Sequence, residues 1–415
     1  MIGKLSDARL LAGAALVLPS IGMIAPLGVA PLLAVVAPLL LVVEKRRPTV
    51  LHRPLGALTI LLAAMTLWGA ASSSWSIIPA HSLFEAGRFA LISAAGLVVV
   101  AAASTLDTAG RAQVGRAALG GFVLGVGVLA VELWGGFPIH RALSGLALAD
   151  IRLAKLDRGA TVLSLACWVP ILFLVQRGRR FAAILVFLVT LAALDRLISL
   201  SAVFGLLAAA VGFALAWWRP RATALLMAGG FAVLLAVMPI RAPTRDTVLW
   251  LSEVAPWLRT SAQHRLIIWR FTDDRIAEKP LLGWGMDASR AIPGGKTSVR
   301  VYMSLPDSIQ LEGDVMPLHP HDAILQWTVE LGVVGTLLGG AIILCLAWLA
   351  GVAGGATRAT RAIGLATFAG ALPPLLLSFG IWQAWWQSTL WIAAALVVAA
   401  GDRPDTGAAV PKISA

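Results

Sequence analysis

Three short motifs set residues 241–335 apart from the rest of the chain: HRLIIWRF (264–271), KPLLGWG (279–285) and HPHDAILQWTVELG (319–332). This is the one long polar interval in a sequence that otherwise consists of apolar runs. Its first part predicts an extramembrane segment rich in arginine, and its last part leads directly into an apolar helix. We therefore expect the chemistry of this protein to lie here, with the apolar runs holding the interval against a bilayer.

The composition predicts a membrane protein. Of the 415 residues, 59% are hydrophobic and 13% are charged, whereas soluble domains carry about 25% charged residues. Apolar runs of about 17–25 residues, the length that crosses a bilayer as a helix, recur along the chain. We expect an all-α polytopic membrane protein of about 12 transmembrane helices, surrounded by membrane lipids. The expected order is nine helices, a large and partly helical loop domain, three helices and a tail, in residues 1–240, 241–320, 321–401 and 402–415.

Basic residues indicate how the helices are oriented. With this count, four basic loops fall on one side of the membrane, and the positive-inside rule makes that side cytoplasmic. These loops contain residues 46–47, 177–180, 219–221 and 358–361. Both termini are then cytoplasmic, and the loop domain is exoplasmic. Because such loops explain much of the net charge of +12, we expect no nucleic-acid partner. The tryptophans of WQAWWQ (382–387) are expected in an aromatic belt at the outer surface.

The first candidate site residue is an arginine on a helix. Residues 261–279 fit a helix that Pro280 ends, and Arg265 and Trp269 share one of its faces because they are four residues apart. Arginine presents a planar fork of donors that suits phosphate oxygens. The pair is therefore either an anion-binding arginine held by an aromatic ring or a simple stack on an exposed helix.

HPHD is the sharpest local feature. Asp322 favours the positive end of the helix that begins here, and that end disfavours protonation of His321, which leaves a neutral imidazole able to accept a proton. The helix places Asp322, Gln326 and Glu330 on one stripe, and acidic residues in membrane spans are usually functional or paired. The alternative is that His319 and His321 simply lie at the membrane interface.

Two further cations lie in or near the membrane. Arg88 follows Glu85 by one turn, so the two side chains can form a structural ion pair. Arg196 lies where the apolar region 181–218, too long for one span, is expected to divide into two helices near Asp195. It can pair with Asp195 or face the loop domain.

The order of these motifs resembles the signature of the O-antigen ligase and polymerase superfamily. The motifs lie between Arg265 and Gly335, and the plan of many spans with one large late loop extends the resemblance to most of the chain. The matching residues are Arg265-x-x-x-Trp269, Pro280-Leu-Leu-Gly283-Trp-Gly285, His321-Asp322-x-x-Leu325 and Glu330-Leu-Gly332.

This resemblance implies a periplasmic glycosyltransferase of the bacterial inner membrane. In the ligases, a polysaccharide carried on undecaprenyl pyrophosphate moves to a sugar of lipid A–core. The family's loop arginine falls on Arg265 and its histidine on His321, although the family usually has Asn where this chain has Asp322. The family also often carries Ser-Arg at the outer end of a middle helix. Arg196 either is that arginine or stands one turn before its usual place, at Leu200.

The expected chemistry follows from the leaving group. A pyrophosphate needs cations where charge develops, and Arg265 and Arg196 are the first candidates, with Arg88 a weaker one. His321 either takes the proton of the attacking hydroxyl, orients the acceptor or binds phosphate. His-x-His has no clear third and fourth zinc ligand at metal spacing. No paired aspartates in an early exoplasmic loop indicate a metal-bound diphosphate, so we expect neither metal nor cofactor. The other expected substrate-binding residues are Trp269, His319, Asp322 and Glu330.

Two alternatives to a ligase remain open. An O-antigen polymerase would share the signature and the donor but use another polymer chain as acceptor. A lipid or solute transporter would carry out no covalent chemistry, and it would place polar residues near mid-membrane in several helices. In this sequence the polar groups concentrate at the outer edge of the predicted bundle, which favours an enzyme.

Overall fold

The computed structural model describes most of the chain and is almost entirely helical within those residues. The described residues are 6–44, 53–148, 153–238, 247, 250, 254–255, 260–300, 312–352 and 355–403. The helices of the apolar part are α1 (Asp7–Ile24), α2 (Val29–Glu44), α3 (Arg53–Ala71), α4 (Pro79–Ser104), α5 (Thr108–Trp134), α7 (Asp157–Ala166), α8 (Trp168–Gln176), α9 (Arg180–Asp195), α10 (Leu200–Trp218), α11 (Pro220–Val237), α14 (Ala323–Gly351), α15 (Arg358–Leu377) and α16 (Ala384–Ala400).

The remaining elements are α13 (Thr260–Glu278), a polar helix of 19 residues, and several short pieces. The short pieces are α6 (Pro138–Ser144), the strands β1 (Ser298–Arg300) and β2 (Glu312–Asp314), and 3-10 turns at Pro26–Gly28, Ser72–Ser74, Leu153–Leu156 and Ala288–Ala291. The two strands pair antiparallel, with Ser298 opposite Asp314. The helix expected over 261–279 is confirmed as α13. Much of 239–259, all of 301–311 and the tail from 404 lie outside the described residues.

The multi-pass membrane fold is confirmed. Within the described residues, 10 helical segments are long and apolar enough to cross a membrane, and α7 and α8 together form one of them. The helix α16, of 17 residues, is shorter but also apolar, and α9, of 16 residues, precedes α10. The predicted division near Asp195 is also found, between α9 and α10. A helix satisfies its own backbone hydrogen bonds, which lipid cannot do, so each apolar run folds in this way.

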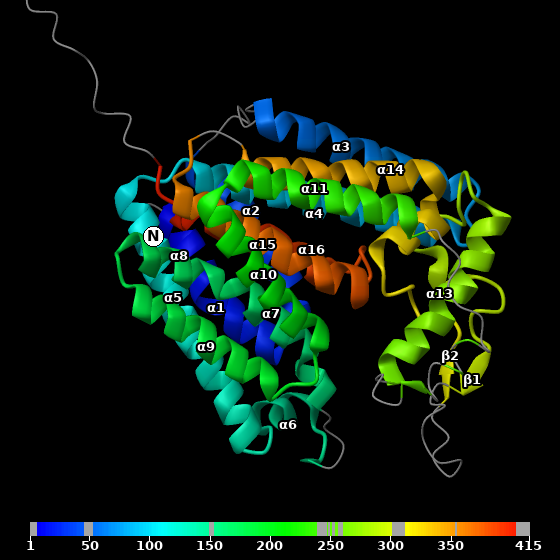
Figure 1. Cartoon of the computed structure of the whole chain (residues 1–415), viewed down its shortest axis with the longest axis horizontal. Coiled ribbons are helices and arrows are strands. Elements are labelled where there is room, and N and C mark those ends of the chain that lie inside the picture. The colour runs from blue at the N-terminus through cyan, green and yellow to red at the C-terminus, as the bar shows by residue number, and fades with distance from the viewer. Residues whose placement is uncertain are drawn as a thin grey trace, which may run out of the picture.

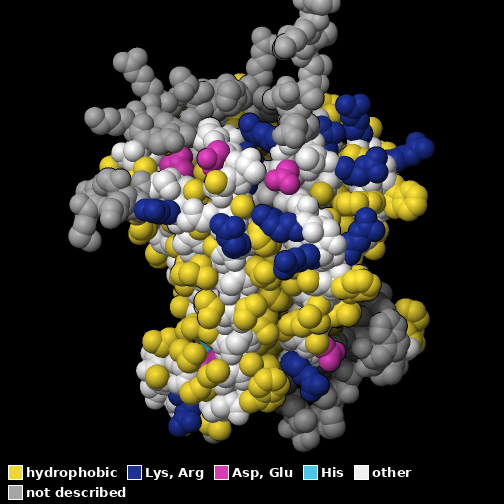
Figure 2. Space-filling model, turned by 90° about the vertical axis from the view of Figure 1, so that its left-hand side faces the viewer, with side chains coloured by type: hydrophobic (Ala, Val, Ile, Leu, Met, Phe, Trp, Pro, Cys, Tyr) yellow, Lys and Arg dark blue, Asp and Glu magenta, His cyan; other side chains and the backbone are white. Residues whose placement is uncertain are grey.

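The extramembrane elements gather at one end of the helices. Figure 1 shows α13, β1 and β2 together at the right, beside the end of α14 at which that helix begins. At the opposite end, Thr357 donates its N–H to Asp402 O at 3.3 Å, so the start of α15 meets the end of α16. That end carries many Lys and Arg side chains and few acidic ones, as Figure 2 shows.

The predicted basic loops agree with this polarity. Pro220, within the loop at 219–221, lies against Gly351 at the end of α14 that is far from α13. The loop at 358–361 begins α15 at the same end. Residues 46–47 lie outside the described residues. The tryptophan-belt prediction was wrong for the WQAWWQ segment, because Trp382, Trp385 and Trp386 are buried in the protein.

α14 is broken near its start, and the motif KPLLGWG fills the break. Gly332 has φ 64° and ψ −163°, a conformation that is essentially restricted to glycine. Trp284 N–H donates to Val329 O at 2.9 Å, and Gly285 N–H donates to Glu330 O at 2.7 Å. These bonds satisfy carbonyl groups that the helix leaves unpaired. Non-helical backbone at membrane depth is tolerated only where protein groups supply such partners.

Two tryptophans, in α3 and in the α3–α4 connection, also bind to the segments at this break. Trp68 of α3 donates its indole N–H to Leu331 O at 3.0 Å, and Trp75, just after α3, donates to Leu282 O at 3.1 Å. The backbone of the loop domain is therefore attached both to α14 and to the α3–α4 connection. This joint positions the extramembrane residues above the membrane helices.

The joint leads to a stability prediction. A Cβ atom on Gly332 would lie 2.1 Å from Leu281 O, and the φ of Gly332 is positive. We expect Gly332→Ala to destabilise the folded protein by about 2 kcal/mol or more, because both backbone strain and a clash result. The measurement is the thermal unfolding midpoint in detergent. Gly229→Ala is the control, because a Cβ there meets no atom within 4 Å. Equal midpoints for the two variants would contradict the role of the break.

Candidate functional site

The HPHD segment forms a strained turn at the start of α14. His321 has φ 61°, in the left-handed region that few residues other than glycine adopt. Its N–H donates to His319 Nδ1 at 3.1 Å, and the two ring centroids lie 4.3 Å apart. Asp322 caps the helix by accepting from Leu325 N–H at 2.9 Å. Strain of this kind is often found at functional sites.

His321 is held in one tautomer. Its Nδ1 lies 2.5 Å from Ser378 O, in the segment between α15 and α16. Because a carbonyl oxygen only accepts, Nδ1 carries the proton and Nε2 is an unprotonated acceptor. The pKa of His321 is lowered to about 4, chiefly by burial and also by the charges of Arg265 and His264, whereas the bond to Ser378 raises it. A neutral His321 was predicted from the helix end, but burial is the larger cause.

α13 brings Arg265 to the two histidines. Trp269 donates its indole N–H to Pro320 O at 2.9 Å, so α13 is attached to the HPHD backbone. One turn earlier, Arg265 Nη1 donates to Ser261 O at 3.1 Å, while its buried Nε has no partner among the described residues. The charge of Arg265 contributes to the lowered pKa of His319 as well. Trp269 therefore contacts the site through a hydrogen bond from its indole N–H to the backbone carbonyl of Pro320.

His319 and Asp322, both predicted to bind substrate, are largely buried within the turn. The exposed fraction is 6% for His319 and 2% for Asp322. His319 Nε2 lies 3.3 Å from the side-chain nitrogen of Gln383. Burial lowers the pKa of His319 well below its ordinary value and raises the pKa of Asp322 to about 7. These contacts support a role in shaping the turn that carries His321.

Glu330 is fully buried beneath the site, so the structure does not place it where a substrate could contact it. Its carboxylate accepts from Asp287 N–H at 2.9 Å and from Ser289 Oγ at 2.6 Å. Gln326 Nε2 at 3.1 Å and the indole N–H of Trp382 also donate to it. The predicted polar stripe on α14 is present, but Glu330 joins the loop domain to the segment before α16.

Arg88 forms the ion pair that its spacing allowed. Its guanidinium contacts Glu85 and donates to Trp382 O at 2.9 Å. Glu85 is also 3.8 Å from His81 Nε2, and the same nitrogen is 2.8 Å from Asp287 Oδ2. Arg88 thus belongs to a polar network that links α4, the loop domain and the segment before α16.

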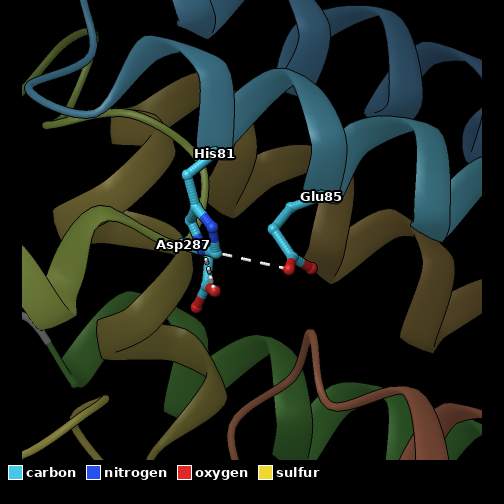
Figure 3. A group of neighbouring side chains, drawn as sticks. All are labelled: His81, Glu85 and Asp287. Atoms are coloured by element: carbon cyan, nitrogen blue, oxygen red, sulfur yellow. Dashed lines mark hydrogen bonds and ion pairs between the residues drawn. The ribbon is translucent and has the colours of Figure 1, made fainter.

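His81, Glu85 and Asp287 are the metal-ligand candidates within the described residues. They offer three donor atoms that lie within 4.8 Å of one another, and Figure 3 shows the three side chains converging from α4 and the loop domain. Arg88 pairs with Glu85, and Arg290 pairs with Asp287 at 2.6 Å. Because each carboxylate already has a cation, the cluster needs no metal ion for charge balance.

Arg196 is placed differently from the other predicted residues. It caps the C-terminus of α9, and its side chain is exposed. Within the described residues, no contact joins Arg196 to His321 or Arg265. Its predicted role in binding phosphate remains a prediction.

Several residues around the site were missed by the sequence analysis. Arg290 acts on His319 electrostatically, and the guanidinium of Arg158 lies 5.8 Å from the ring centre of Trp385. Ser378 orients His321, and Trp382 contacts both Glu330 and Arg88. WQAWWQ was the available signal, but tryptophans at the end of an apolar run indicate a membrane interface as readily as a buried contact.

The network predicts a local effect of Glu330→Gln. The amide would place a donor among groups that all donate, at a cost of about 1–3 kcal/mol. We expect a lower unfolding midpoint and faster backbone hydrogen exchange over residues 284–289, with little change in α1 and α5. Glu278→Gln, an exposed member of an ion pair on α13, should leave both unchanged. Unaltered exchange over 284–289 in Glu330→Gln would contradict the positioning role.

Comparison with known proteins finds a family model whose matched range includes much of this site. Residues 181–339 match the family model described as O-antigen ligase, a range that includes Arg196, Arg265 and His321 but not Arg88. A protein of Rickettsia felis, provisionally described as a polysaccharide ligase, is 27% identical over 404 residues, covering 90% of this chain and 93% of that relative.

Two further relatives carry the same provisional description. The protein of Rickettsia conorii is 29% identical over 289 residues, covering 68% of this chain and 66% of its own. The protein of Rickettsia typhi is 32% identical over 262 residues, covering 62% of this chain and 61% of its own. The matched range includes the broken α14 and the turn that carries His321. This chain is a multi-pass membrane protein, and its residues 181–339 are similar to the O-antigen ligase family.

Proposed function

We propose that this protein is an O-antigen ligase that transfers a polysaccharide from undecaprenyl pyrophosphate to a sugar of lipid A–core. The observation that carries the proposal is the attachment of α13, which carries Arg265, to the HPHD turn through Trp269 and Pro320 O, where Nε2 of His321 is an unprotonated acceptor. A cation beside a neutral acceptor suits a reaction in which an anionic group leaves while a hydroxyl loses its proton. The provisional description of two relatives as polysaccharide ligases supports the same class of reaction.

The proposed chemistry is one displacement at the anomeric carbon. The acceptor hydroxyl oxygen forms the new bond to that carbon, and the bond to the diphosphate oxygen breaks with its electron pair remaining on the diphosphate. The hydroxyl proton moves to Nε2 of His321. Arg265 stabilises the charge that develops on the leaving diphosphate. With no proton on Nε2, His321 is a poor donor to phosphate oxygens, which favours the base or orienting role over phosphate binding.

We place the reaction on the periplasmic side of a bacterial inner membrane. The end with many basic side chains lies opposite α13 (Figures 1 and 2), and the positive-inside rule assigns such an end to the cytoplasm. This orientation makes the N-terminus cytoplasmic and agrees with a cytoplasmic C-terminus. We also propose that the transfer is independent of metal, because Arg88 and Arg290 already neutralise the carboxylates of the cluster in Figure 3.

The proposal predicts loss of transfer in two variants. Arg265→Ala and His321→Ala should each lower the transfer rate by at least about 100-fold, because each removes a group that acts on the developing transition state. The assay uses purified protein, a polyprenyl-diphosphate-linked saccharide, lipid A–core and a chelator of divalent ions. Arg270→Ala is the control, since Arg270 lies on the same helix and pairs with Asp274 at 3.1 Å.

The same variants, returned to cells that lack the gene, separate the ligase from its alternatives. A ligase defect leaves core unmodified while long polymer accumulates on its lipid carrier. Core bearing a single repeat unit would instead identify a polymerase. Full attachment in His321→Ala or Arg265→Ala would overturn the assignment of the site, and loss of wild-type transfer in the chelator would overturn metal independence.

The pH dependence should reveal how His321 is used. As free enzyme, His321 becomes protonated only near its pKa of about 4, so kcat/KM should stay level down to that region and fall below it. A bound diphosphate adds negative charge beside the ring and raises its pKa. We therefore expect the acid limb of kcat at a higher pH than that of kcat/KM. An acid limb of kcat/KM near the ordinary histidine value of 6.5 would contradict the role of a buried neutral base.

A further inference from the structure

Arg290 is held at the site by a chain of contacts that begins at the broken helix. It belongs to the 3-10 turn Ala288–Ala291, which directly follows the segment paired with α14. Its Nη2 lies 2.6 Å from Asp287 Oδ2. Asp287 is fixed in turn by His81 Nε2 at 2.8 Å and, through its own N–H, by Glu330 at 2.9 Å.

This arrangement is built at a cost to the backbone. Asp287 has φ 54°, so it shares the left-handed conformation of His321. Such conformations are unfavourable for residues other than glycine and persist only where surrounding contacts hold them. The contacts with His81 and Glu330 hold Asp287 in this conformation. The position of Arg290 is therefore defined by contacts with two membrane helices, α4 and α14.

Arg290 keeps donors available for a ligand. Its side chain is 40% exposed, and within the described residues its guanidinium makes no hydrogen bond other than the one to Asp287. Arg88, by contrast, is occupied by both Glu85 and the carbonyl of Trp382. Arginine donors arranged as a planar fork suit phosphate oxygens. Of these two cations near the network, Arg290 is the better placed to bind an anion.

Arg290 and Arg265 belong to two elements that are attached to the surroundings of the histidine pair. Trp269 attaches α13 to Pro320 O. Glu330 accepts from Ser289, in the turn of Arg290, and from Trp382, which is next to Gln383, a contact of His319. Arg265 comes from α13, and Arg290 from the turn after GWG. Both act electrostatically on His319, and Arg265 also acts on His321. A diphosphate carries two anionic groups, so two separate cations around one acceptor imidazole match it better than a single cation does.

We propose that Arg290 is a second anion-binding side chain of this site, which takes one phosphate group of a lipid-linked diphosphate while Arg265 takes the other. Asp287 is its positioning residue. This inference rests on the proposed function, because that function supplies the diphosphate. It assigns to the pair Arg265 and Arg290 the selection of a diphosphate over a monophosphate.

Binding of two lipids by the purified full-length protein tests the proposal without any transfer reaction. The probes are undecaprenyl diphosphate and undecaprenyl monophosphate in detergent. We expect Arg290→Ala to weaken diphosphate binding by about 10- to 100-fold, the size of a lost charge-assisted hydrogen bond. Monophosphate binding should change much less, so the preference for diphosphate largely disappears. Arg290→Lys keeps the charge but loses the planar fork of donors, so its diphosphate affinity should lie between those of Arg290→Ala and the wild type.

The matched control is Arg275→Ala. Arg275 also pairs with a carboxylate three residues away, Glu278 at 2.9 Å, and its replacement should leave both affinities within about twofold of wild type. Unfolding midpoints separate misfolding from lost contacts, and Asp287→Asn should weaken diphosphate binding while Arg290 is still present. Diphosphate binding by Arg290→Ala equal to that of the control would overturn the proposal. Competition by phosphatidylglycerol as strong as by the diphosphate would also overturn it, because the site would then bind ordinary lipid headgroups.

The outcomes also separate this inference from the proposed function. Arg290-dependent diphosphate binding without transfer to lipid A–core would leave the inference standing and remove the ligase assignment. If transfer depends on Arg265 and His321 but the diphosphate affinity is unchanged in Arg290→Ala, the ligase assignment stands and the role of Arg290 is removed.

Discussion

The site depends on a break in a membrane helix. Where α14 departs from helical geometry at Gly332, the carbonyl groups of Val329 and Glu330 accept instead from the backbone of residues 284–285. Lipid cannot satisfy such groups, so the loop segment must occupy the break. One physical requirement, the pairing of every buried backbone group, thus attaches the extramembrane residues to the membrane part with little freedom.

The buried carboxylate of Glu330 connects the break in α14 to the residues around His321. It contacts the loop domain through Asp287 and the segment before α16 through Trp382, and the latter segment orients His321 through Ser378. Two strained residues, Asp287 and His321, are the described positive-φ residues of the site other than glycine. Their strain is compensated by the contacts around them, and the result is an acceptor nitrogen held in one orientation beside arginine side chains.

Much of the fold could be predicted because length and hydropathy decide membrane helices directly. The division near Asp195, the helix α13 and the start of α14 all followed from apolar runs and caps. The role of Glu330 could not be predicted, because its partners at 287–289 and Trp382 are more than 40 residues distant. The break at Gly332 could not be predicted either, because the sequence does not show which of the 40 glycines in the chain interrupts a helix. Trp382 was misplaced because an aromatic residue at the end of a run fits the membrane interface equally well.

The most direct measurement is a cryo-EM structure of the protein with a bound polyprenyl diphosphate. We expect density for the diphosphate beside Arg265, on the side of the HPHD turn where Nε2 of His321 is available, with the lipid chain leading toward the membrane helices. Diphosphate density elsewhere, for example beside the exposed Arg196 at the end of α9, with none near His321, would contradict the placement of the reaction at this turn.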